Sequence, residues 1–515
     1  MRKTIYTGYV LLLVAALSAC SKKFSERVPV NSPTDANFWN NESEASSAVA
    51  GSYALLRTAL NEMGMAYYYY GDIPTDEFVA RTNGEDYPAL TQIQWQTFVA
   101  PSQTFRGLIK MRRWDNFYRA VDQENRCLKY IQPIGLDKFT SADKQGAKNT
   151  LLGESYFLRA FTYFYMSRVW GDVPLVTQTE FDAAVTPNIP RMAQAKVLDQ
   201  CVSDLQEAIK LLPFVPGATA NRPIRANRGT CFALLAHIYA WKGEYEKVVP
   251  NADSVILKGG YTHVPRSIKA TYLSMFKGNS SEGIFEISQN SNIEGSLITP
   301  NYGDINNSIA ARTLKAPYLA TNLGNSLFTL DAIALGNLFP NNADSVDLRR
   351  RNGFDYWGTT DPICIKYSNI LYTNTTTNPP SSPLSLNNII VFRLADIKLL
   401  KAEALAATGK PGDARTIVNE IRGLAGLGAS TTTDANMFET VIDERGRELF
   451  LEGHRFYDLV RLGRKTGTMK FNGSGTVIRM DAAQFQLGKY YWPVEPILIS
   501  LNPLISQTPY WADKM

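Results

Sequence analysis

The chain has 515 residues, of which 20% are charged, and its formal net charge is +5 at pH 7. This length is enough for a large core of several layers or subdomains. The nearly neutral balance, without a basic face interleaved with aromatic residues, argues against a nucleic-acid-binding protein. Because the only histidines are His237, His263 and His454, a histidine-rich metal site or a Ser/His/Asp triad has little to build with, and we expect neither a metal ion nor a cofactor.

The N-terminal segment has the features of a bacterial lipoprotein signal. Arg2 and Lys3 precede an apolar run over residues 9–17 that is too short to span a bilayer, and small residues then lead to Cys20. We therefore predict that residues 1–19 are removed and that the Cys20 thiol is acylated, so that the protein is exported and tethered. The rest of the chain contains no second apolar stretch of membrane-spanning length.

Helical periodicity dominates the mature chain. Helices are predicted at residues 42–60, 110–131, 143–170, 193–212, 229–241, 244–257, 391–407, 412–424 and 438–462. Short strands are predicted at 284–288 and 363–367, whereas 290–313 and 372–386, rich in Asn, Ser, Thr, Gly and Pro, indicate long loops. We accordingly divide the mature chain (20–515) into an N-terminal helical part (20–289), a loop-rich and partly β insertion (290–386) and a C-terminal helical part (387–515).

Two helix pairs share a spacing of small, bulky and turn-glycine positions that is typical of a tetratricopeptide-like hairpin. These positions are Ala236, Tyr239, Gly243 and Tyr245 in the first pair and Ala402, Leu405, Gly409, Ala414 and Ile421 in the second. Small residues allow two helices to approach closely, and the glycine ends the first helix and forms the turn. Because the pairs are far apart in sequence, we predict a mainly α, tetratricopeptide-like scaffold that is interrupted by the insertion.

A stripe of charged residues follows the second pair at helical spacings: Glu444, Arg445, Glu448, Glu452, Arg455 and Asp458. Paired catalytic carboxylates of a glycosidase face each other across a cleft and usually come from different segments. Acids and bases on adjacent turns of one helix instead form ion pairs. We therefore interpret the stripe as a structural ladder that locks a single helix over residues 438–462 against its neighbours.

Aromatic residues give the better argument for a binding site. Four consecutive tyrosines at 67–70 lead into a polar, turn-rich segment. Sugars bind to such mixtures, because their C–H faces lie on aromatic rings while their hydroxyls bond to Asp, Asn and Arg. The candidate ligand residues are Tyr68, Tyr70, Asp72, Arg81 and Trp95, with Tyr356 and Trp357 in the insertion as a second group. The alternative, that the tyrosines cover the helical core, has equal weight because four in a row cannot all face one way.

The remaining cysteines are Cys127, Cys201, Cys231 and Cys364, and no two of them form a Cys-x-x-Cys pair. The first three lie in predicted helices, where cysteine usually packs as a small apolar residue. An exported location permits a disulfide, but this pattern does not indicate one.

Three ordered blocks of sequence carry a family resemblance. The first contains Glu154, Arg159-Ala160 and then Trp170-Gly171-Asp172-Val173-Pro174. The second contains Arg393-Leu394-Ala395-Asp396, residues 418–422 and the charged stripe, and the third contains Tyr491-Trp492-Pro493-Val494, Asn502-Pro503 and residues 507–510. Together with Cys20 they resemble the SusD/RagB family of Bacteroidetes nutrient-uptake lipoproteins over essentially the whole mature chain.

The resemblance implies a binding protein rather than an enzyme. Members of that family have a tetratricopeptide-like scaffold with a loop-rich ligand face, and each forms the lid of a SusC-like TonB-dependent transporter at the outer membrane. We therefore expect a lipid-anchored protein facing the cell exterior that captures a nutrient, most simply an oligosaccharide. The alternatives are a peptide-binding member of the same class, a secreted helical glycan-degrading enzyme, and an anchored scaffold that binds only proteins.

Overall fold

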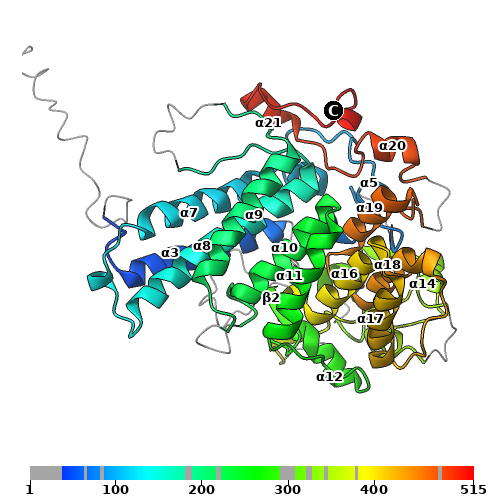
Figure 1. Cartoon of the computed structure of the whole chain (residues 1–515). Coiled ribbons are helices and arrows are strands. Elements are labelled where there is room, and N and C mark those ends of the chain that lie inside the picture. The colour runs from blue at the N-terminus through cyan, green and yellow to red at the C-terminus, as the bar shows by residue number, and fades with distance from the viewer. Residues whose placement is uncertain are drawn as a thin grey trace, which may run out of the picture.

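The computed structural model of the chain describes residues 37–62, 66–81, 86–179, 188–215, 222–289, 308–319, 327–340, 346–376, 381–473 and 478–515. The predicted signal segment and Cys20 lie outside these residues. Figure 1 shows a mainly helical molecule in which long helices lie side by side and the last segment of the chain crosses one end of them. Among the described residues, no helix has the length and apolar character needed to cross a membrane.

The long helices are α3 (Glu42–Leu60), α7 (Asp115–Ile131), α8 (Lys144–Trp170), α9 (Gln194–Leu211), α10 (Arg228–Lys242), α11 (Tyr245–Lys258), α16 (Leu394–Ala407), α17 (Pro411–Leu424), α18 (Met437–Glu448) and α19 (Arg455–Thr466). Most match the predicted ranges to within a few residues. The exceptions are 110–131, which the structure divides between α6 and α7, and 438–462, which it divides between α18 and α19.

Shorter helices connect and cover these: α4 (Ala66–Gly71), α5 (Tyr87–Thr91), α6 (Gly107–Met111), α12 (Lys269–Ser274), α13 (Ile309–Thr313), α14 (Ala332–Leu338), α15 (Leu348–Gly353), α20 (Ala482–Gln486) and α21 (Pro496–Leu501). Single 3₁₀ turns occur at Leu136–Lys138, Met275–Lys277, Asp434–Asn436 and Pro509–Trp511.

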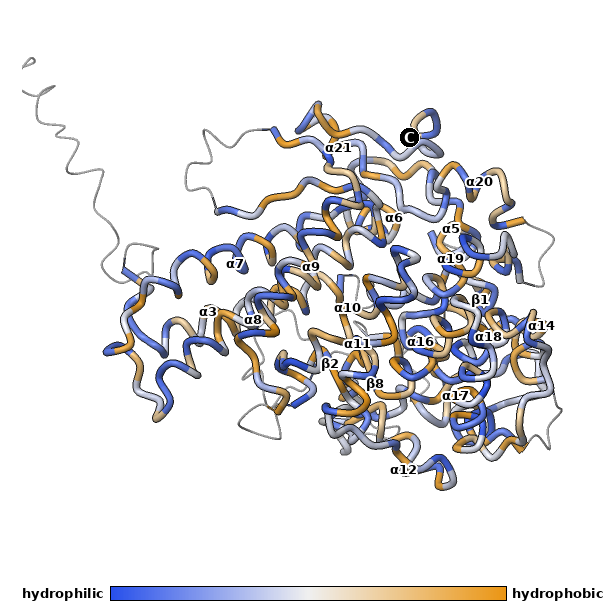
Figure 2. Tube along the Cα trace, viewed as in Figure 1, coloured by the Kyte–Doolittle hydropathy of each residue, from blue (hydrophilic) through white to orange (hydrophobic). Residues whose placement is uncertain are grey.

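The first four long helices pack as neighbours, α3 on α7, α7 on α8 and α8 on α9. Asn41 and Asp143 cap α3 and α8, because each side chain accepts a hydrogen bond from a backbone N–H in the first turn of its helix. In Figure 2, hydrophilic and hydrophobic residues alternate along α7, as expected for a helix with one buried face. By contrast, α8 is buried along nearly all of its C-terminal half.

The two tetratricopeptide-like pairs are α10–α11 and α16–α17, and each turns at a glycine with left-handed backbone, Gly243 (φ +76°) and Gly409 (φ +78°). Although they are distant in sequence, α11 packs directly on α16. Side chains of both pairs share one apolar cluster that includes Ala236, Val248 and Ala404. The prediction of a mainly α helical scaffold interrupted by an insertion is therefore confirmed.

The insertion leaves and rejoins the scaffold through two paired strands, β2 (Gly283–Ile287) and β8 (Ile389–Arg393), which are antiparallel and buried. Other paired strands are β1 (Phe78–Ala80) with β3 (Phe328–Leu330), β4 (Phe354–Asp355) with β5 (Ile363–Cys364), and β6 (Ile370–Asn374) with β7 (Ser381–Ser385). Because β2 and β8 lie side by side, the two ends of the insertion between them are close together.

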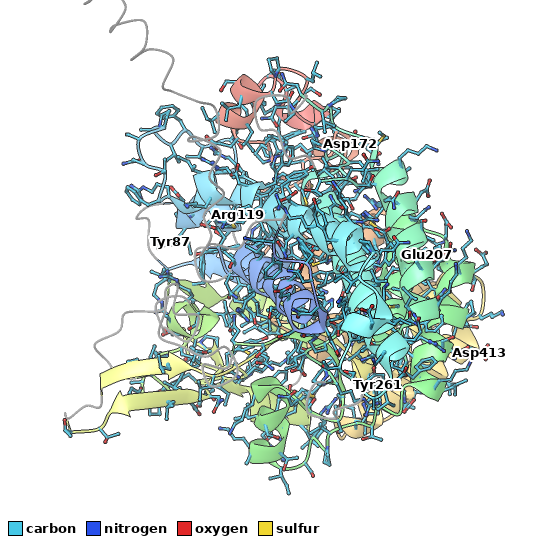
Figure 3. All side chains as sticks on the ribbon, turned by 90° about the vertical axis from the view of Figure 1, so that its left-hand side faces the viewer. Tyr87, Arg119, Asp172, Glu207, Tyr261 and Asp413 are labelled. Carbon is cyan, nitrogen blue, oxygen red and sulfur yellow. The ribbon has the colours of Figure 1, made fainter. Side chains whose placement is uncertain are left out.

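The prediction of an irregular loop over 372–386 is wrong, because β6 and β7 form a hairpin that extends away from the body in Figure 3. Its Asn and Pro residues are poor strand formers by propensity. Propensity scales mainly report packing on a half-buried surface, and a projecting ribbon needs only the hydrogen bonds between its own strands.

The prediction of one charged helix over 438–462 is also wrong. The chain turns between α18 and α19, where Leu451 (φ +56°) and Gly453 (φ +81°) have left-handed backbone. The stripe therefore makes most of its ion pairs with other segments. Glu448 accepts hydrogen bonds from Arg266 (2.8 Å), Arg349 (3.2 Å) and Arg393 (2.8 Å).

The rest of the stripe behaves similarly. Glu452 is paired with Arg393 and Lys366, Arg455 with Asp76, Glu444 with Arg349, and Arg445 with Asp396 and Asp458. All these stripe residues are buried. The network ties the insertion and the N-terminal part to the C-terminal helices, so the expected structural role of the stripe is confirmed although its residues do not lie on one helix.

Candidate ligand-binding face

The four tyrosines of α4 point in different directions, and each meets an aromatic ring from another part of the chain. Tyr67 lies against Tyr165, Tyr68 against Tyr367, Tyr69 against Phe328, and Tyr70 against Trp170 and Trp492. None is more than 4% exposed. The tyrosines therefore occupy the core, which is the alternative that the sequence left open.

Trp95 and Asp72 are buried as well. Trp95 is fully buried and stacks on Trp492 with 4.0 Å between ring centroids. Asp72 accepts a 2.7 Å hydrogen bond from the Gly453 N–H, and burial raises its pKa to about 8. Gly71 allows this contact, because a Cβ there would lie 2.4 Å from the Gly453 carbonyl oxygen. We therefore do not assign Tyr68, Tyr70, Asp72 or Trp95 to a ligand face.

Arg81 is placed differently. It follows β1, and its backbone N–H donates to the Leu327 carbonyl next to β3. Because β1 pairs with β3, Arg81 lies beside the insertion. There its guanidinium forms an ion pair with Asp361, and the two side chains are 31% and 23% exposed. The Thr329 hydroxyl donates to the same carboxylate at 3.2 Å.

Lys315 completes this cluster from a third segment. Its Nζ donates to the Asp361 carboxylate at 2.6 Å and to the Asp361 carbonyl at 2.8 Å. Burial raises the pKa of Asp361, but hydrogen bonds from Arg81 and Lys315 outweigh it and hold that pKa below its usual value. Asp361 is therefore an ionised acceptor that fixes two cations while all three side chains stay in contact with water.

Of the two aromatic candidates of the insertion, Tyr356 lies beside these ions, and Trp357 packs edge-on against Phe339 and Phe354. The Tyr356 ring centroid is 4.0 Å from Lys315 Nζ, and the Tyr356 hydroxyl donates to the Ala316 carbonyl at 2.8 Å. Trp357 has the Arg350 guanidinium 4.8 Å from its ring centroid. Both rings are partly exposed. Tyr356 has left-handed backbone (φ +55°), a strained conformation for a tyrosine that aims its ring at this position.

A second carboxylate and ring extend the same face. The Tyr318 hydroxyl donates to Asp355 at 2.5 Å, and Lys269 Nζ approaches that hydroxyl at 3.3 Å. Burial and the Asp355 carboxylate together raise the pKa of Tyr318 to about 12. The loop face, defined by Arg81, Lys315, Tyr318, Asp355, Tyr356, Trp357 and Asp361, thus combines partly exposed rings with planar hydrogen-bonding groups.

Sequence reasoning singled out neither of the two most exposed phenylalanines in the described part of the chain. In the loop between α5 and α6, Phe98 is 83% exposed and Phe105 is 62% exposed. Thr104 of the same loop lines a hollow of about 200 Å³ together with Glu62, Lys110 and Arg113. The sequence could have indicated their exposure, because these phenylalanines lie on either side of an Ala-Pro-Ser-Gln-Thr turn sequence. A turn of that composition lies at the surface.

In Figure 3, Tyr87 lies toward the same edge of the molecule as the projecting hairpin, while Glu207 and Asp413 lie at the opposite edge on the helical scaffold. Tyr87 packs edge-on against Phe328 of β3, with 5.6 Å between ring centroids. The short helix α5 and the projecting hairpin therefore lie toward one edge of the molecule, opposite α9 and α17. The four cysteines Cys127, Cys201, Cys231 and Cys364 are buried free thiols, and no disulfide joins them.

A helical scaffold whose loops present partly exposed aromatic rings and charged side chains is suited to binding a ligand. Comparison with known proteins agrees. The SusD family matches residues 352–511, and a family described as starch-binding and associating with the outer membrane matches residues 38–240.

Individual relatives span nearly the whole chain. The SusD-like protein P38 of Formosa agariphila is 27% identical over 493 residues, covering 90% of this chain and 92% of that protein. The starch-binding protein SusD of Bacteroides thetaiotaomicron is 35% identical over 111 residues, covering 21% of this chain and 19% of that protein. The crystal structure of a SusD homologue from Bacteroides thetaiotaomicron superposes with a TM-score of 0.77 at 25% identity, covering 92% of this chain and 99% of that one.

The chain therefore belongs to the SusD/RagB family and is SusD-like across most of its length. As a member of this family it is a binding protein that associates with the outer membrane, and it is not an enzyme.

Proposed function

We propose that this protein is a cell-surface lipoprotein that captures an oligosaccharide on the loop face and acts as the lid of a SusC-like TonB-dependent transporter. The observation that carries the ligand class is the Asp361 carboxylate, which holds Arg81 and Lys315 beside the partly exposed ring of Tyr356. Sugar C–H faces stack on such rings, and sugar hydroxyls bond to fixed charged groups. The relative from Bacteroides thetaiotaomicron is named a starch-binding protein, which makes a neutral glucan one ligand to test.

The proposed ligand residues are Arg81, Tyr356 and Trp357, with Asp361 and Lys315 as residues that position them. Calorimetry of the mature protein with glucan, pectic and other oligosaccharides tests this assignment. Losing one stacking ring costs about 0.5 to 1.5 kcal/mol, so Tyr356→Ala should weaken binding by roughly two- to tenfold. Arg81→Ala should weaken binding of the same sugar.

Matched controls are available elsewhere. Tyr156→Ala removes a partly exposed ring from α8, and Arg415→Ala removes an arginine whose ion pair with Asp434 lies on the surface. Neither should change sugar affinity. Normal binding by both loop-face variants would contradict the assignment, and binding of peptides in place of every sugar would identify the peptide-binding variant of the same function.

The anchoring and partner parts of the proposal rest on the lipoprotein signal that ends at Cys20 and on the family. Cys20→Ala should abolish lipid labelling and membrane retention of the precursor. Crosslinking in intact cells should recover the anchored protein with a TonB-dependent transporter. Unchanged labelling in the variant, or recovery of the protein only as an isolated species, would overturn the corresponding part.

A further inference from the structure

The loop between α5 and α6, residues 92–106, has an uncharged and strongly apolar surface. No Asp, Glu, Lys or Arg occurs between Tyr87 and Phe105, in a chain of which 20% of the residues are charged. Phe98 is 83% exposed and Phe105 is 62% exposed, and residues 99–101 between them are at least partly exposed. Depletion of charge together with enrichment of aromatic residues is typical of the core of a protein–protein interface.

Hydrogen bonds hold the backbone of this loop in place. Arg112 is buried, and its Nη2 donates to the Thr97 carbonyl at 2.7 Å, directly before the first exposed ring. The Asp86 carboxylate accepts a 3.1 Å hydrogen bond from the Leu108 N–H, which joins the start of α5 to α6 at the base of the loop. Backbone hydrogen bonds of 2.8 and 3.0 Å form two further turns within residues 100–106. Both rings are therefore presented from a fixed base, so less conformational freedom is lost when a partner covers them.

The uncharged loop adjoins the loop face. Helix α5, which leads into it, packs on β1, and β1 ends one residue before Arg81. Tyr87 of α5 packs edge-on against Phe328, and the next residue, Thr329, donates to Asp361. In Figure 3, Tyr87 lies toward the edge of the molecule from which the β6–β7 hairpin of the insertion projects. A large body that covers the loop face would therefore reach the uncharged loop as well.

The shape and chemistry of the loop distinguish between kinds of occupant. Small ligands bind in concave sites that surround them, whereas a side chain that is 83% exposed projects from the surface. Projecting aromatic side chains act as anchors that fill pockets on a partner protein. The loop face offers sugar hydroxyls the charged partners that the uncharged loop lacks. A membrane that covered the two rings would also cover the adjoining loop face and close it to ligands.

We propose that Phe98 and Phe105 are anchor residues for the TonB-dependent transporter and enter apolar pockets on its extracellular surface when the lid closes over the loop face. This inference rests on the proposed function, which supplies the transporter and the closure. Burial of the two phenyl rings removes apolar surface from water and so stabilises the closed state without any contact to the ligand.

Site-specific photocrosslinking of the full anchored protein in intact cells tests the contact directly. A photoreactive benzoylphenylalanine in place of Phe98 should crosslink to a TonB-dependent transporter, identified by mass spectrometry of the crosslinked species. The same photoreactive residue in place of Leu257, which is 77% exposed on the scaffold helix α11, should not crosslink to it. A transporter crosslink from the position of Leu257 and none from that of Phe98 would overturn the proposal.

A double variant measures what the two rings contribute. Phe98→Ala/Phe105→Ala should lower the recovery of co-purified transporter at least about tenfold, because truncation of one buried aromatic anchor commonly weakens an interface by that factor. Val215→Ala/Leu257→Ala is the matched control, since it removes apolar side chains that are 53% and 77% exposed elsewhere, and recovery should not change. Both double variants should keep the melting temperature and the oligosaccharide affinity of the wild-type protein.

The outcomes separate this inference from the proposed function. If the wild-type protein is recovered without any transporter, the proposed function fails and this inference fails with it. If the wild-type protein and Phe98→Ala/Phe105→Ala recover the transporter equally, only this inference is overturned. Weaker oligosaccharide binding by the variant at normal transporter recovery would assign the rings to the sugar. Flotation of the wild-type protein with phosphatidylethanolamine vesicles, lost in the variant, would assign them to a membrane, and either result overturns the inference.

Discussion

Two ionic clusters in this protein use the same residue types in different surroundings. Around Glu448, the side chains of Arg266, Arg349 and Arg393 are at most 1% exposed. Around Asp361, the side chains of Arg81 and Lys315 are 31% and 26% exposed. The buried cluster joins segments of the fold and is closed to solutes, whereas water, or a sugar hydroxyl in its place, can reach the second. Burial, rather than residue type, separates a structural ion cluster from a candidate ligand face.

Removing one ion from each cluster should therefore have very different costs. Glu448→Gln leaves three buried guanidinium groups around a neutral amide, and we expect the free energy of unfolding to fall by about 3 to 5 kcal/mol in urea titrations. Asp434→Asn is the matched control, because Asp434 pairs with Arg415 at 2.6 Å but is 66% exposed. Its effect should stay below about 1 kcal/mol. Equal losses in the two variants would remove the distinction between the clusters.

Asp72 differs from both clusters, because it is a buried carboxyl group without an ion pair of its own. We expect it to make the stability of the protein depend on pH. Burial raises the pKa of Asp72 from 3.8 to about 8. Between these values the folded state holds a proton that the unfolded chain has lost, so stability from this group is present at low pH and declines as pH rises from about 4 to 8. The decline reaches at most about 1.4 kcal/mol per pH unit for one group.

Asp72→Asn should flatten this decline, because the amide stays neutral at every pH. Urea unfolding at pH 5, 6, 7 and 8 measures the slope for wild type and variant. Burial also raises the pKa of Glu124 to about 8 and that of Glu286 to about 7, so part of the slope should remain in Asp72→Asn. Parallel curves for the two proteins would show that Asp72 titrates normally in the folded state.

The smallest effect on stability is expected at the loop face. Asp361→Asn keeps an acceptor for Thr329 and exposes Arg81 and Lys315 to water that already reaches them, so the free energy of unfolding should change by less than about 1 kcal/mol. The same urea titrations decide this. A fall in the free energy of unfolding comparable to that of Glu448→Gln would show that the loop-face cluster is structural. It would then count against a role in ligand binding.

The long helices, the family and the class of function could be predicted from the sequence. Periodicity located helices such as α3 and α9, because a helix that packs on one face must repeat its apolar residues at about 3.6 positions. Turn glycines such as Gly243 and Gly409 were equally readable, since few other residues adopt left-handed backbone without strain.

The structure places only some of the candidate ligand residues at the surface. Arg81, Tyr356 and Trp357 lie on the loop face, but the four tyrosines, Asp72 and Trp95 are buried. Composition could not distinguish the two groups, because an aromatic residue next to polar residues fits a sugar platform and a core contact equally well. The sequence did not indicate Asp361 or Lys315. Their role depends on a cluster with Arg81, which lies more than two hundred residues away in the sequence.

The sequence by itself determined most of the long helices, the turns of the two tetratricopeptide-like pairs, and the resemblance of three ordered blocks to one family. Only the tertiary structure decided which charges are buried, that α11 packs on α16, and that Arg81 meets Asp361. The physical reason is the range of the interactions. Helix periodicity and turn geometry act over a few residues, whereas burial and ion pairing depend on segments that approach one another only when the whole chain has folded.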